Sequence, residues 1–138
     1  MSYAGDLTPD EAYQLLESQP DAILVDVRTK AEWSYVGVPD LSEVGRPLVL
    51  SEWVTFPDGA RNPQFLDDLT AAAKSTAAPV VFLCRSGVRS VAAAQAATEA
   101  GFTAAYNITE GFEGPSDASG HRGTAAGWKV RGLPWRQS

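Results

Sequence analysis

The chain contains 138 residues, 44% of them hydrophobic and 20% charged, which is the balance of a globular domain with a buried core and not of a disordered segment. Its formal net charge of −6 argues against general nucleic-acid binding, which requires basic surfaces that displace counterions from phosphates. No apolar run approaches the roughly 20 residues of a membrane span, so we expect no membrane association.

The beginning of the chain, residues 1–6, has neither the basic nor the apolar segment of a secretory signal peptide. Thr8 and Glu11 then form a capping-box pattern around Pro9, which predicts the start of a short amphipathic helix. The nearly continuous apolar run over residues 22–27 is typical of a strand that is buried on both faces.

A second capping-box pattern, at Thr29 and Glu32, predicts a brief helix that carries Trp33. Gly37 and Pro39 are expected to end this helix. Strand and helix signals therefore already alternate in this part of the chain.

The middle of the chain continues in the same way. Residues 48–50 predict a short strand, and Asn62-Pro63 predicts the start of a third helix. Residues 80–83 form another fully apolar strand, which leads directly into Cys84.

The last clear elements are an alanine-rich helix from about Arg89 to Ala100, ended by Gly101, and a strand over residues 104–108. Strands that alternate with helices predict an α/β fold, in which a parallel sheet has helices on both faces. We expect residues 1–138 to form a single domain, in which the polar residues 111–127 make a long loop.

Cys84 is the most informative residue, because ligands of such sheets bind beyond the carboxyl ends of the strands. The residues that follow it are Arg85, Ser86, Gly87, Val88, Arg89 and Ser90. The next helix offers unpaired N–H groups and a positive dipole end, and Gly87 allows successive N–H groups to converge. Two arginines add positive charge and two serines add hydroxyl donors, so the loop favours a nucleophilic thiolate and binds anions. We therefore predict Cys84 and Arg89 as catalytic, with Arg85, Ser86, Gly87, Val88 and Ser90 binding substrate.

The alternative is that Cys84 is an inert, buried residue, as most free cysteines are. Cations at a helix start oppose the helix dipole, however, which makes a purely structural role for Arg85 and Arg89 unfavourable. Acidic residues outnumber basic ones up to Ala78 and the balance reverses beyond it. This is either chance clustering on solvated faces or a charge distribution that attracts a small anion to the half that carries Cys84. One cysteine cannot form an internal disulfide, so we expect a reducing, cytoplasmic location.

Three ordered segments carry a recognisable pattern. They are Leu24-Val25-Asp26-Val27-Arg28 with Glu32-Trp33, the Cys-x-x-Gly-x-Arg loop at Cys84, and Gly111-Phe112-Glu113-Gly114 followed by Gly127-Trp128 and Gly132-Leu133-Pro134. Together they resemble the rhodanese (thiosulfate sulfurtransferase) family over nearly the whole chain, from about Leu7 to Trp135.

The resemblance implies a three-layer rhodanese-like fold with a central, mostly parallel sheet of about five strands. It also implies that Cys84 takes a sulfane sulfur from thiosulfate or a similar anionic donor and passes it, from a persulfide, to cyanide or a thiol. The backbone N–H groups from Arg85 to Arg89 would cradle the persulfide, and these two arginines would orient the substrate. Asp26 and Arg28 match a pair that we expect to be mainly structural.

No cofactor and no metal are expected. One histidine and one cysteine fall short of a zinc site, and no P-loop or dinucleotide fingerprint is present. Because there is no second cysteine to resolve a persulfide, we expect an external acceptor of the thioredoxin or glutathione type. The chain has no heptads and no long apolar edge, so a monomer is expected.

The sequence departs from the family pattern in two places. The usual Gly-His-Ile-Pro-Gly-Ala segment is here Val36 to Leu41, without the histidine, which concerns local packing more than chemistry. Residues 115–126 look like an inserted loop, and they contain His121 and Arg122. This loop is either a lid or partner surface over the site, or a surface loop with no role in turnover.

Two other functions remain open. A cysteine phosphatase or arsenate reductase of the same fold would have five residues between its cysteine and arginine. Here Cys84 and Arg89 enclose four, and a shorter loop makes a narrower cradle that suits one sulfur atom. The second alternative is a non-enzymatic persulfide carrier or binding module that docks to another protein.

Overall fold

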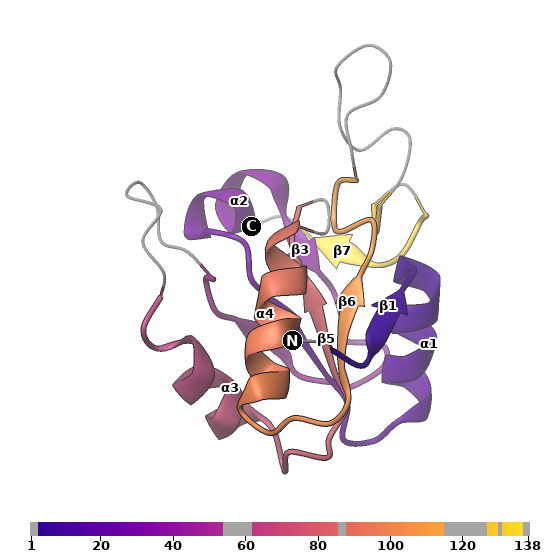
Figure 1. The fold of residues 1–138 in the computed structure, drawn as a ribbon. Coiled ribbons are helices and arrows are strands. Elements are labelled where there is room, and N and C mark those ends of the chain that lie inside the picture. Colours follow the sequence, from indigo (N-terminus) through magenta and orange to yellow (C-terminus); the bar gives the residue numbers. More distant parts are fainter. Residues whose placement is uncertain (1–2, 54–61, 86–87, 115–126, 130, 137–138) are drawn as a thin grey trace.

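A five-stranded parallel sheet forms the centre of the computed structural model, which describes residues 3–53, 62–85, 88–114, 127–129 and 131–136 (Figure 1). The strand order is β1-β6-β5-β2-β4, and every pairing in this sheet is parallel. The strands are β1 (Gly5–Leu7), β2 (Ile23–Asp26), β4 (Leu48–Leu50), β5 (Val80–Leu83) and β6 (Ala105–Ile108). A separate antiparallel pair joins β3 (Val38–Pro39) to β7 (Trp135–Arg136).

Four helices accompany the sheet in the described residues: α1 (Pro9–Ser18), α2 (Lys30–Val36), α3 (Phe65–Ala72) and α4 (Val88–Glu99). The capping boxes expected at Thr8 and Thr29 are both present, and each threonine hydroxyl accepts the backbone N–H of the glutamate three residues later. Gly101, which is expected to end α4, has a φ of +108°. These local signals are therefore confirmed.

The two faces of the sheet carry two hydrophobic cores, because neighbouring residues of a strand point to opposite faces. On one face, Ile23 and Val25 pack with side chains of α3 and α4. On the other face, Leu24 packs with α1 and with the buried Trp128 near the C-terminus. Figure 1 shows α4 and α1 on either side of the strands. The expected α/β fold, with a parallel sheet of five strands and helices on both faces, is confirmed.

The structure corrects one expected boundary and adds three strands. The third helix begins at Phe65 and not at Asn62-Pro63, because Asn62 Oδ1 accepts the Gln64 N–H in a turn that precedes the helix. The short strands β1, β3 and β7 have no clear pattern in the sequence, since each depends on a partner distant along the chain. The expected inserted loop at 115–126 lies outside the described residues.

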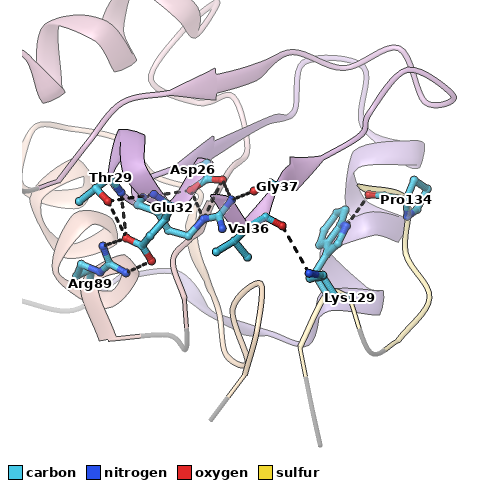
Figure 2. Close-up of polar contacts among 10 residues, drawn as sticks. Asp26, Thr29, Glu32, Val36, Gly37, Arg89, Lys129 and Pro134 are labelled. Carbon is cyan, nitrogen blue, oxygen red and sulfur yellow. Dashed lines mark hydrogen bonds and ion pairs between the residues drawn. The ribbon is translucent and has the colours of Figure 1, made fainter. Parts of the chain in front are cut away.

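A buried ion pair joins the end of β2 to the loop that follows it. The Asp26 and Arg28 side chains are both 0% exposed, and the Arg28 guanidinium donates from Nε and Nη2 to the Asp26 carboxylate. Arg28 Nη2 also donates to the Gly37 carbonyl oxygen at 2.7 Å, which fixes the end of α2 (Figure 2). The pair thus has the structural position expected of it.

Among the described residues, no helix is long and apolar enough to cross a membrane.

Replacing Asp26 with Asn should destabilise the protein by about 3–5 kcal/mol, because it leaves the buried Arg28 charge without its counterion. The free energy of unfolding in urea measures this loss. Asp21→Asn is the matched control, since it removes an ion pair with Lys74 whose side chains are 75% and 50% exposed. Such exposed pairs contribute little, so equal unfolding midpoints for the two variants would contradict the structural role of Asp26.

Candidate active site

Cys84 lies at the carboxyl edge of the sheet, directly after the central strand β5 and shortly before the 12-residue helix α4. The residue is only 1% exposed and belongs to the core on the α3 and α4 face. The residues between Cys84 and α4 include Ser86 and Gly87, which lie outside the described residues. The sulfur is therefore held at the point where a parallel sheet presents its ligand site.

Ser90 is one of the expected site residues, and it contacts the cysteine. It lies in the first turn of α4, and its Oγ is 3.2 Å from Cys84 Sγ. The same hydroxyl donates a hydrogen bond to Oδ1 of Asn107, a residue of β6. Ser90 and Asn107 are both buried. Asn107 was not predicted as a site residue, since its only signal in the sequence is a polar side chain in a mostly apolar strand.

Arg89 points to α2, where its two terminal nitrogens donate to the two carboxylate oxygens of Glu32 at 2.7 and 2.9 Å (Figure 2). Burial raises the pKa of Glu32, but hydrogen bonds from Arg89 and from the Thr29 backbone N–H outweigh burial and lower that pKa to about 2. In turn, the hydrogen bonds to Glu32 raise the pKa of Arg89. The positive charge of Arg89 is thus balanced by Glu32.

The two arginines of the loop differ in their surroundings. The Arg85 side chain is exposed, while Arg89 is held in the ion pair with Glu32. Val88 begins α4, where backbone N–H groups lack partners within the helix. The sequence analysis assigned Glu32 only a capping role. Its second role requires α2 and α4 to meet, which no local pattern could indicate.

A tight turn over residues 111–114 holds the backbone of the cysteine loop. The Phe112 N–H donates to the Cys84 carbonyl oxygen at 2.8 Å, and the N–H groups of Glu113 and Gly114 donate to the Arg85 carbonyl oxygen at 3.0 and 3.1 Å. These bonds satisfy main-chain acceptors that a loop after a buried strand would otherwise leave unpaired. The turn therefore fixes where the loop leaves β5.

Gly111 makes this close approach possible. Its φ is +67°, and a Cβ built on it would lie 2.5 Å from the Arg85 carbonyl oxygen and 2.6 Å from the Cys84 carbonyl oxygen. Both contacts are with backbone and are too short for any side chain. A glycine is thus required here by conformation and by space.

The C-terminal segment supports the turn from the other side. The Trp128 N–H donates to the Gly111 carbonyl oxygen at 2.9 Å, and the buried Trp128 indole donates to the Pro134 carbonyl oxygen at 2.7 Å. The Phe112 ring lies 4.3 Å from the centre of the Arg28 guanidinium, a cation–π contact with the buried ion pair. Three segments that are distant in the sequence therefore meet around the cysteine loop. They contain Arg28, the turn at residues 111–114 and Trp128.

The model of the STR4 middle domain family matches residues 5–138. The chain belongs to the STR4 middle domain family. The crystal structure of Rv0390 from M. tuberculosis is similar to this chain with a TM-score of 0.90 and 57% identity, over 99% of this chain and 100% of that one. An uncharacterized protein of Rickettsia rickettsii, a homolog of RP600, is 40% identical over 127 residues, which cover 91% of this chain and 92% of that protein.

Two further matches link this chain to rhodanese-like proteins. The thiosulfate sulfurtransferase GlpE of Glaesserella parasuis is 29% identical over 109 residues, 79% of this chain and 83% of that protein. The polysulfide-sulfur transferase homodimer of Wolinella succinogenes has a TM-score of 0.62 and 26% identity, over 96% of this chain and 78% of that one. The rhodanese-like fold expected from the sequence is thereby confirmed.

Gly111→Ala should displace the cysteine loop, because the new methyl group would collide with the carbonyl oxygens of Cys84 and Arg85. We expect a loss of stability of about 1–3 kcal/mol, together with faster alkylation of Cys84 as its burial is lost. Gly45→Ala is the matched control, since Gly45 has nearly the same φ, +66°, but no atom within 4 Å of the added Cβ. Similar losses in both variants would show that only backbone conformation matters at Gly111.

The pairing of Glu32 with Arg89 should contribute about 1–3 kcal/mol at neutral pH. Because the pKa of Glu32 is lowered from 4.5 to about 2 by folding, this contribution is present above pH 4.5 and is lost as pH falls to about 2. Urea unfolding of the wild type and Glu32→Gln, measured against pH, tests this expectation. The difference between them should vanish across that window, and a difference independent of pH would contradict it.

Proposed function

We propose that this domain is a sulfurtransferase, which moves a sulfane sulfur from thiosulfate or a similar donor to a thiol or cyanide through a persulfide on Cys84. The observation that carries the proposal is the position of Cys84. Cys84 lies between the end of a central parallel strand and the beginning of a long helix. The main-chain carbonyl groups of Cys84 and Arg85 are hydrogen-bonded to the turn at residues 111–114. The similarity to a thiosulfate sulfurtransferase and to a polysulfide-sulfur transferase supports it.

In the first half-reaction, the Cys84 thiolate attacks the outer sulfur of thiosulfate. The sulfur–sulfur bond of thiosulfate breaks, sulfite leaves with the electron pair of that bond, and Cys84 becomes a persulfide. In the second half-reaction, an acceptor nucleophile attacks the terminal sulfur, and the cysteine departs as a thiolate. No net oxidant is required, because the sulfane sulfur keeps its oxidation state throughout.

The loop would stabilise the negative charges of both steps. We infer that the backbone N–H groups from Arg85 to Arg89 would bind a thiolate, a persulfide anion and a departing oxyanion, because the positive end of the α4 dipole favours anions. The exposed Arg85 is suited to attract the anionic donor. Arg89 would act as fixed positive charge beside the sulfur. Ser86, Gly87, Val88 and Ser90 complete the proposed substrate-binding set.

The acceptor would be an external thiol. The chain has a single cysteine, so its persulfide cannot be resolved by an internal disulfide. A thioredoxin- or glutathione-type thiol in a reducing compartment such as the cytoplasm would meet this need. The loop with four residues between Cys84 and Arg89 favours a sulfur atom over a tetrahedral phosphate as the bound group.

Incubation of the wild type with thiosulfate should add one sulfur atom to the intact mass, and cyanide or a thiol should remove it. Cys84→Ser, treated side by side, should gain nothing. Release of sulfite in equal amount would show that the donor bond was broken. A folded, fully reduced wild type that gains no sulfur from thiosulfate or polysulfide would contradict the proposal, whereas sulfur accepted only from a partner protein would favour a persulfide carrier.

A further inference from the structure

A chain of hydrogen bonds leads from the Cys84 sulfur to the edge of the sheet. Ser90 Oγ lies 3.2 Å from Cys84 Sγ and donates to Asn107 Oδ1, and Asn107 Nδ2 donates to Asp6 Oδ1 at 3.0 Å. Asp6 and Asn107 are directly paired in the register of β1 and β6. We propose that Asp6 and Asn107 are positioning residues, which set the direction of the Ser90 hydroxyl proton and thereby the ionisation and reactivity of Cys84.

Asp6 sets the orientation of Asn107, because an ionised carboxylate can only accept hydrogen bonds. It therefore requires the amide of Asn107 to present its NH2 group toward β1. The Asn107 carbonyl oxygen must then point the other way, to Ser90. The orientation of the Asn107 amide therefore follows from the acceptor, Asp6 Oδ1, on the neighbouring strand.

Tyr3 reinforces the same orientation. Its hydroxyl donates to Asp6 Oδ1 at 2.7 Å, the oxygen that also accepts from Asn107. The hydrogen bond to Asp6 raises the pKa of Tyr3, so the phenol remains a donor at neutral pH. Asp6 is an exposed residue, and its Oδ1 thus receives two donors, one from Tyr3 and one from Asn107.

Ser90 has a single hydroxyl proton, and Asn107 Oδ1 accepts it. A second, simultaneous donation from Ser90 to the sulfur is therefore impossible. Toward Cys84 the serine oxygen presents only lone pairs, which accept a hydrogen bond from a thiol and repel a thiolate. The sequence predicts Ser90 as a donor to the thiolate, whereas in the resting site its single proton is donated to Asn107.

The chain would act as a restraint on the nucleophile. For Ser90 to stabilise a thiolate, its hydroxyl must rotate from Asn107 to the sulfur, and Asn107 Oδ1 then loses its donor. Removing the acceptor at position 6 would free the Asn107 amide to turn its NH2 group to Ser90 Oγ. The Ser90 proton could then point to Cys84, and the thiolate would form at lower pH.

The test is the rate of Cys84 alkylation by iodoacetamide against pH, because only the thiolate reacts. Asp6→Ala should move the midpoint of this profile down by about one pH unit, the shift expected from one hydrogen bond to a charged group. In a Ser90→Ala background, Asp6→Ala should shift nothing, since the transmitting hydroxyl is absent. Arg89, which interacts electrostatically with Cys84, and its partner Glu32 are unchanged in all variants.

Asp6→Asn separates the hydrogen bond from the charge. An asparagine at position 6 keeps an acceptor oxygen, held by Tyr3, and should retain a profile close to wild type. If Asp6→Asn and Asp6→Ala shifted the midpoint equally, the carboxylate would act only through its charge, and the proposal would be wrong. An unshifted Asp6→Ala, or a shift that persists without Ser90, would also overturn it.

The inference rests on the proposed function only in taking Cys84 as the reacting sulfur. Alkylation involves no sulfur donor or acceptor, so the two proposals fail separately. A shifted alkylation profile without persulfide formation would retain the positioning role and reject sulfur transfer. Persulfide formation with identical profiles for all variants would do the reverse.

Discussion

The hydrogen bonds from the turn at residues 111–114 to the carbonyl oxygens of Cys84 and Arg85 are the constraint on which this site depends. A chain that leaves a buried strand has main-chain acceptors to satisfy, and here distant residues supply the donors. Gly111 allows the backbone of the turn to approach that of Cys84 and Arg85, and the Trp128 N–H donates to the Gly111 carbonyl oxygen. The direction of the cysteine loop is therefore set by the C-terminal part of the fold.

Two ion pairs, Asp26–Arg28 and Glu32–Arg89, connect other elements near the cysteine loop. The Arg28 guanidinium, which is paired with Asp26, makes a cation–π contact with the Phe112 ring. The ion pair of Glu32 with Arg89 joins α2 to α4. Each pair satisfies charges that would be costly if buried alone. The elements around the cysteine are thus joined by one fully buried and one half-buried ion pair.

The sequence predicts the parts of the structure that depend on neighbouring residues. The capping boxes at Thr8 and Thr29 and the apolar run into Cys84 give helices and strands in the right order. Residue patterns did not predict three of the contacts around the site. These are the hydrogen bond from Asn107 to Asp6, the ion pair of Arg89 with Glu32, and the close approach of Gly111 to the cysteine loop. Each joins segments distant along the chain, so it appears only when the strand order is known.

Hydrogen exchange of the backbone amides, followed by NMR, tests the central constraint most directly. The amides of Phe112 and Glu113 donate to the cysteine loop, so they should exchange as slowly as those of the central strand β5. Rates as fast as those of an unstructured chain would mean that the turn does not hold Cys84 and Arg85, and the account of the site would fail.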